Sequence, residues 1–160
     1  MSKEVITTAI LMIASIVAVV AFVNAVLPAV YGLSESYTSL SRNMENQLKT
    51  DINVIFIYPE DNNVSVWIKN VGSSSIPFSQ LQYSNVFVFS SSGYWDANFE
   101  SGTLPSWDYT LENGDGNDYW NRGETLKLTI DFQDLEPGTY KLNFFLYNGV
   151  SASDTFSTST

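Results

Sequence analysis

The sequence predicts an all-β, immunoglobulin-like sandwich preceded by a single N-terminal transmembrane helix with a helical extension. Three observations support this fold class. The chain carries no charge from Val5 to Ser34, apolar residues beyond Pro28 recur at a helical period, and from Asp51 onward the period changes to two. We therefore divide the 160 residues into a membrane-spanning helix over 1–34, an amphipathic extension over 35–50 and a sandwich over 51–160.

The uncharged segment is long enough to span a bilayer, whose hydrocarbon core takes about 20 helical residues. From Val5 to Leu27 it is apolar except for four polar residues: Thr7, Thr8, Ser15 and Asn24. A cleaved secretory signal and a buried core helix are the competing interpretations. A signal has a basic start followed by an apolar stretch of only about 7–15 residues. Here the start, Ser2-Lys3-Glu4, is barely basic, and the apolar stretch from Val5 to Leu27 is longer than a signal needs. We therefore favour a membrane helix.

An apolar stripe follows Pro28, where we expect a kink near the membrane edge. Its members lie 4, 3, 4 and 4 residues apart, close to a heptad seam: Leu33, Tyr37, Leu40, Met44 and Leu48. The stripe packs either against the chain's own globular part or against a second copy or a sister subunit. Both interpretations stay open, because the repeat covers only about two heptads. These five residues are candidate interface residues.

The remaining chain is predicted to be strands. A turn over 59–63 separates one alternating run, with Ile52, Val54, Phe56 and Tyr58 on one face, from a second one over 64–69, so the two form a hairpin. Further strands are expected at Ser84 to Phe89, Tyr94 to Phe99, Trp107 to Leu111, Thr125 to Phe132, Thr139 to Tyr147 and Ala152 to Phe156. Short strands at this spacing, with no helical run between them, favour an antiparallel immunoglobulin-like sandwich.

The aromatic residues of this half are expected mainly in its core. All four tryptophans lie there, at positions 67, 95, 107 and 120, and with many Phe and Tyr beside them core packing is favoured over a carbohydrate-binding platform. Tyr140 follows a Pro-Gly turn and is expected either to form a tyrosine corner or to pack as an ordinary core residue.

Composition excludes several functions. The net charge of −10 argues against a nucleic-acid partner, because such proteins need a basic face. The chain has no histidine and no cysteine, which removes Ser-His-Asp and Cys-His nucleophiles, the usual zinc ligand sets, haem, iron–sulfur clusters and disulfides. We predict that the protein is not an enzyme and has no cofactor, with calcium as the one candidate ion.

The candidate calcium site lies in the most polar segment, Glu112 to Glu124. Its ligands would occupy loop positions 1, 3, 5 and 12 of a calcium-binding spacing: Asn113, Asp115, Asn117 and Glu124. The first position is Asn rather than Asp, and Asp118 stands where the turn calls for Gly. A solvated acidic turn is the alternative. Asp115 and Glu124 are also the carboxylate pair that a hydrolase would use, but nothing in the sequence places them across a cleft.

Asn63-Val64-Ser65 is an N-glycosylation acceptor triplet at the tip of the first predicted hairpin, where a glycan is tolerated. Basic groups are nearly balanced across the apolar segment, with Lys3 and the amino terminus on one side and Arg42 and Lys49 on the other, so they do not set the orientation. From the triplet and the sandwich we predict that the globular part lies outside the cell membrane.

Two stretches resemble archaeal flagellar (archaellum) accessory proteins of the FlaG/FlaF family, FlaG more closely. They are the start over 4–15, with the helical extension that leads up to Lys49-Thr50-Asp51-Ile52, and the segment over 66–73, whose sharpest part is the strand end Lys69-Asn70-Val71-Gly72-Ser73. The resemblance implies a non-catalytic subunit of the archaellum motor: a single-pass membrane anchor with an outer sandwich, part of a stationary, stator-like scaffold. Its implied partners are the cytoplasmic membrane, further copies or a sister accessory protein, and the surface layer.

Two alternatives come from other functional classes. A pilin-like or archaellin-type filament subunit shares the layout but normally carries a short basic leader, and Ser2-Lys3-Glu4-Val5 offers no convincing version of it. A surface-attached binding or hydrolytic module is the other alternative. For a scaffold, sheet edges are the natural contact surfaces, and we select the strand at Ser84 to Phe89, with Val86, as the contacting edge.

Overall fold

The computed structural model describes residues 2–159 and divides at Asn43/Met44 into two compact units. Helix α1 (Ser2–Lys49) continues through Pro28 without interruption. The predicted boundary at residue 34 therefore does not coincide with a break in the helix, and the outermost domain limits, residues 1 and 160, lie outside the described residues. The apolar part of α1 is long and hydrophobic enough to cross a membrane.

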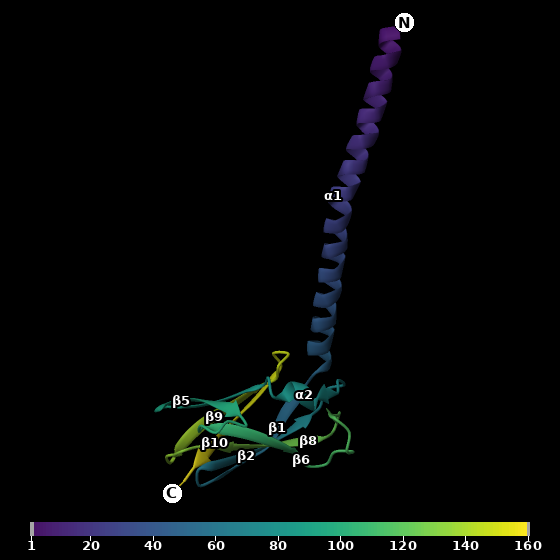
Figure 1. Ribbon diagram of the computed structural model, residues 1–160. Coiled ribbons are helices and arrows are strands. Elements are labelled where there is room, and N and C mark those ends of the chain that lie inside the picture. Colours follow the sequence, from purple (N-terminus) through teal and green to yellow (C-terminus); the bar gives the residue numbers. More distant parts are fainter. Residues whose placement is uncertain (1, 160) are drawn as a thin grey trace. The chain divides into compact units, whose positions relative to one another are not determined.

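The second unit is a two-layered sandwich (Figure 1). One layer has the strand order β1-β2-β8-β6 and the other β5-β4-β9-β10. The strands are β1 (Ile52–Glu60), β2 (Asn63–Asn70), β4 (Asn85–Ser90), β5 (Gly93–Phe99), β6 (Ser106–Leu111), β8 (Thr125–Asp131), β9 (Gly138–Phe145) and β10 (Ser151–Thr158). A two-residue parallel pairing of β5 with β6 joins the layers on one side, and β1 lies beside β10 on the other.

This order confirms the immunoglobulin-like prediction. In such domains the strands called A, B, E and D form one sheet, and C, F and G form the other. Here β1, β2, β8 and β6 take the places of A, B, E and D, and β4, β9 and β10 take those of C, F and G, with β5 added beside β4. Three short elements lie outside this pattern and were not predicted: β3 (Ile76–Pro77), α2 (Phe78–Leu81) and β7 (Tyr119–Trp120).

Alternate residues of the central strands form the core. Val64, Val66 and Ile68 of β2 are fully buried, and so are Leu126, Leu128 and Ile130 of β8. Two of the tryptophans, Trp107 and Trp120, are among the largest fully buried side chains, as expected for core packing. Burial of this alternating set supplies the main driving force for folding of the sandwich.

A β-bulge in β1 changes which of its residues face outward. The pairing with β2 shifts between Val54 and Phe56, so that Ile55 has no partner across the ladder. Ile52 and Val54 are buried as predicted, but Phe56 and Tyr58 are 55% and 48% exposed. The prediction that all four residues share one face is therefore wrong beyond Val54, because one inserted residue reverses the alternation.

Tyr140 forms the tyrosine corner. Tyr140 is a buried residue, and its hydroxyl donates a 2.7 Å hydrogen bond to the backbone oxygen of Glu136, four residues upstream. Burial, followed by the negative charges of Glu136 and Asp134, raises the pKa of Tyr140 above its ordinary value. The corner ties the start of β9 to the connection that precedes it.

We expect Tyr140→Phe to cost about 1 kcal/mol of unfolding free energy at neutral pH, the usual worth of one hydrogen bond. Because the folded pKa is raised, this contribution is complete below the unfolded tyrosine pKa of about 10 and is lost as the pH rises through the folded value. Denaturant unfolding at pH 7 and pH 11 should show that the difference in unfolding free energy between wild type and variant is smaller at pH 11. A difference that is unchanged at pH 11 would contradict the assignment.

Candidate functional site: the junction between helix and sandwich

The end of α1 is held by the loop that follows β2. The backbone N–H groups of Ser73 and Ser74 donate to the oxygen of Lys49 at 2.8 and 3.0 Å, and those of Val71 and Gly72 donate to the oxygen of Asp51, both at 2.9 Å. The last carbonyls of a helix have no partner within the helix. The loop over 71–74 therefore caps the C-terminal end of α1 and fixes the chain's entry into β1.

Asn70 fixes this loop from inside. Its fully buried side chain donates to the backbone oxygens of Ser74 and Trp120, both at 2.9 Å, and accepts from the N–H of Gly72 at 3.1 Å. A buried amide with all these partners is a stable structural element, whereas one left unpaired is costly. The Lys69-Asn70-Val71-Gly72-Ser73 segment, on which the family resemblance partly rests, thus builds the junction.

Gly72 allows the backbone of the loop to reach the helix end. A Cβ atom added at this position would lie 2.4 Å from the nitrogen of Asp51 and 2.6 Å from the oxygen of Lys49. Both are backbone atoms and cannot turn away as a flexible side chain could. Glycine is therefore required here by close approach of two backbone segments.

A second loop holds the helix end from another direction. The Gln47 side chain donates to the backbone oxygen of Asn148 at 2.6 Å, and the Asn148 side chain donates to the hydroxyl of Thr50 at 3.1 Å. That hydroxyl donates in turn to the oxygen of Asn46 at 2.7 Å. Residues 46–50 are therefore fixed to two separate loops of the sandwich.

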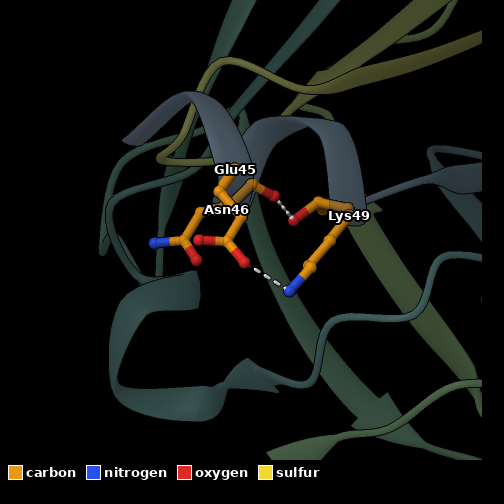
Figure 2. Close-up of polar contacts among 4 residues, drawn as sticks. Glu45, Asn46 and Lys49 are labelled. Atoms are coloured by element: carbon orange, nitrogen blue, oxygen red, sulfur yellow. Dashed lines mark hydrogen bonds and ion pairs between the residues drawn. The ribbon is translucent and has the colours of Figure 1, made fainter. Parts of the chain in front are cut away.

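Figure 2 shows the last turn of the helix. Lys49 lies 2.5 Å from the carboxylate of Glu45, and both side chains are more than half exposed. The hydrogen bond and the positive charge of Lys49 lower the pKa of Glu45. An exposed pair of this kind contributes little to stability, so the junction is stabilised mainly by the backbone hydrogen bonds.

The four predicted calcium ligands lie in one segment of the chain, and their side-chain oxygens accept hydrogen bonds from backbone N–H groups of that segment and of Thr125 next to it. Glu124 is almost fully buried and accepts from the N–H groups of Asp115 and Asn121 at 3.2 and 2.6 Å. Asn113, Asp115 and Asn117 accept from the N–H groups of Thr125, Asn117 and Tyr119, respectively. Within residues 2–159, no group of three or more acidic side chains could hold a metal. Calcium binding stays a prediction.

We expect Glu124→Gln to weaken the loop, because a neutral amide oxygen is a poorer acceptor than a carboxylate. The thermal midpoint should fall by a similar amount in chelator and in millimolar calcium, since these hydrogen bonds need no cation. Asp118→Asn in the same loop is the matched control. A loss of stability that appears only with calcium would assign Glu124 to a metal site instead.

Asn63, the predicted glycosylation site, is the first residue of β2 and is half-buried. Its side-chain oxygen is buried without a hydrogen-bond partner among the described residues. Its modification stays a prediction.

The predicted contact edge is wrong for Val86. Strand β4 is hydrogen-bonded on both sides, to β5 and to β9, and Val86 is fully buried. The strands at the two ends of the hydrogen-bonded order are β1 and β10. The five residues of the helical stripe are exposed, at 55–85%: Leu33, Tyr37, Leu40, Met44 and Leu48.

Sequence reasoning missed two aromatic clusters on the outer faces of the layers. On β1 and β2, Phe56 contacts both Tyr58 and Trp67, and Lys127 lies 5.3 Å from the Trp67 ring centre. On the other layer, ring centres about 6 Å apart connect four residues: Phe87, Phe89, Tyr94 and Phe145. Alternation along a strand predicts which residues share a face. The first cluster could not be assigned to the outer face in this way, because the bulge in β1 is what turns Phe56 and Tyr58 outward.

A family model and a related protein both match nearly the whole chain. A family model described as archaeal-type flagellin matches residues 2–156. A protein of Archaeoglobus fulgidus, described as an uncharacterized protein, is 44% identical over 164 residues, covering 98% of this chain and 99% of that protein.

Among solved structures, two from Sulfolobus acidocaldarius are similar in fold to about two thirds of this chain. One is the archaellum periplasmic stator protein FlaG, with a TM-score of 0.57 and 21% identity over 67% of this chain and 99% of that chain. The other is a chain of the archaellum periplasmic stator protein complex of FlaF and FlaG, with a TM-score of 0.54 and 21% identity over 66% of this chain and 87% of that chain. At this identity the likeness establishes the fold.

Proposed function

Because the chain belongs to the archaeal-type flagellin family, we propose that it is a non-catalytic, membrane-anchored structural subunit of the archaellum motor. It forms part of a stationary, stator-like scaffold. The observation that carries this proposal is the fold, which is similar over 99% of the solved chain of a protein named as an archaellum periplasmic stator. The uncharged helix supplies the anchor that a stationary subunit needs.

The junction supports this role. A stationary subunit would be served by a connection in which the helix leads into the outer domain with no Gly- or Ser-rich linker. Here α1 leads directly into β1, and backbone hydrogen bonds from residues 71–74 fix the residues at which the helix ends. A Gly- or Ser-rich linker at the same place would behave as a flexible coil.

A structural rather than enzymatic role is favoured by how the chain uses its acidic residues. Asp115 and Glu124 were the candidate carboxylate pair, and both are engaged in hydrogen bonds that shape their own loop. A general acid or base needs an oxygen free to meet a substrate.

The partners that we propose are a sister accessory protein, further copies of this chain and the surface layer. A sister protein is supported by the solved complex of FlaF with FlaG, one chain of which has this fold. The outer aromatic clusters on β1–β2 and on β4, β5 and β9 are the apolar surfaces of the sandwich that such contacts would use.

We propose that the sandwich lies outside the membrane, which thiol labelling tests. The chain has no cysteine, so Ser91→Cys, in the exposed turn between β4 and β5, and Ser2→Cys each create a single thiol. A membrane-impermeant maleimide should label position 91 in intact cells and position 2 only after lysis. The reverse pattern would contradict the orientation, and extraction of the chain by alkaline carbonate would contradict the anchor.

The filament subunit remains a second candidate, because the family description names flagellin itself. A filament subunit would be recovered from sheared filaments with a shortened N-terminus. An anchored stator subunit would stay with the membrane and keep its first residues.

A further inference from the structure

We infer that residues 30–44 of α1 form a parallel, in-register coiled coil with the same segment of a second copy of this chain. The inference rests on the proposed function, because anchoring in one membrane makes the helices parallel. The seam consists of heptad positions a and d: Val30, Leu33, Tyr37, Leu40 and Met44. These side chains are 52–65% exposed, and none of the residues described in α1 is buried.

The flanks of the seam suit an identical partner. The e and g positions are occupied by short, uncharged side chains: Ser34, Ser36, Ser41 and Asn43. The charged residues lie away from the seam, at b and f: Glu35, Arg42, Glu45 and Lys49. Charges at e and g commonly select a different partner or repel an identical one. Here two copies meet without a like-charge pair.

The charge of this segment also differs from that of the whole protein. The chain carries a net charge of −10, so its acidic surfaces repel one another. Beyond residue 34 the helix has two acidic and two basic residues and no net charge. Copies can therefore approach along the helix more readily than through most of the sandwich surface.

Both ends of the seam are defined. The next d position is Gln47, whose side chain is hydrogen-bonded to Asn148, so the seam stops where the helix joins the sandwich. In the other direction Val23 and Val26 continue the a and d positions into the apolar segment. A seam of about two heptads is marginal in water. Confinement in a bilayer raises the effective concentration of the copies and stabilises the pairing.

Single-cysteine cross-linking of the full chain in native membranes tests the pairing. Each cysteine is again the only thiol, and the variants form matched pairs two residues apart: Leu33→Cys with Glu35→Cys, and Leu40→Cys with Arg42→Cys. A disulfide needs Cα atoms about 4.4–6.8 Å apart. Mild oxidation should therefore give disulfide-linked dimers at the d positions 33 and 40, and lose them at the f positions 35 and 42.

A charge exchange tests the parallel register. In a parallel pair, the g residue of one copy faces the e residue five positions later in the other, which brings Ser36 next to Ser41 of the second copy. In the Leu33→Cys background, Ser36→Glu with Ser41→Glu should reduce the dimer several-fold. Ser36→Glu with Ser41→Lys should restore it, although residues 36 and 41 do not face each other within one helix.

Three results would overturn the inference: no dimer at either d position, equal dimer at all four positions, or adducts only with a different protein. Packing of the stripe on the chain's own sandwich would give the first. Each can occur while position 91 is still labelled from outside and the chain stays in the membrane, so failure of the coiled coil is distinguishable from failure of the proposed function.

Discussion

Replacing Gly72 by alanine is expected to lower the free energy of unfolding by at least about 2 kcal/mol, a loss typical of overpacking against a rigid neighbour. The added Cβ would overlap the backbone of Asp51 and Lys49, so the capping loop must move and the hydrogen bonds from residues 71–74 to the helix end are strained or lost. Denaturant unfolding of the full chain in detergent micelles, followed by tryptophan fluorescence, measures the loss.

Gly93→Ala and Gly102→Ala are the matched controls. A Cβ at either position meets nothing within 4 Å, so both variants should stay close to wild type. Hydrogen exchange should also report faster exchange at the N–H groups of Ser73 and Ser74 in Gly72→Ala. If Gly72→Ala is as stable as the two controls, the capping loop does not hold the helix end.

Val86→Lys is expected to have the largest effect of any single substitution considered, and to prevent folding of the sandwich. Val86 is fully buried between Ala97 of β5 and Phe144 of β9. An unpaired ammonium group at such a position costs several kcal/mol even if it loses its proton, which is a large part of a domain's whole stability of about 5–15 kcal/mol.

Asn85→Lys is the control, because Asn85 precedes Val86 on the same strand and is exposed. This variant should fold with a midpoint near that of wild type, whereas Val86→Lys should be recovered unfolded or aggregated. A folded Val86→Lys protein that had lost only its assembly would instead revive the interpretation of β4 as a contact edge.

The sequence was most informative where one local pattern decides the structure. The uncharged run predicted the long helix. Alternation located the major strands within a few residues, because side chains that alternate along a strand point to a core face and an outer face in turn. The bulge at Ile55 could not be predicted, since one unpaired residue leaves a sequence that still alternates on either side of it.

Long-range pairing explains the other errors. Strand β4 was taken for an edge, but it pairs with β9, more than 50 residues further along the chain, and no local pattern encodes such a partner. The spacing of Asn113 to Glu124 predicted calcium ligands, whereas the folded loop directs those oxygens to its own N–H groups. The role of Gly72 likewise depends on the approach of residues 49–51, which sequence spacing cannot show.

The position of the chain in the cell and the state of its N-terminus test the central claim most directly. Filaments sheared from cells and the remaining membranes would be analysed separately by intact-protein mass spectrometry. The proposed stator role predicts that the chain is found in the membranes, with the residues ahead of Val5 retained, and is absent from the filaments. Recovery from the filaments, with the N-terminus shortened, would contradict it and identify a filament subunit.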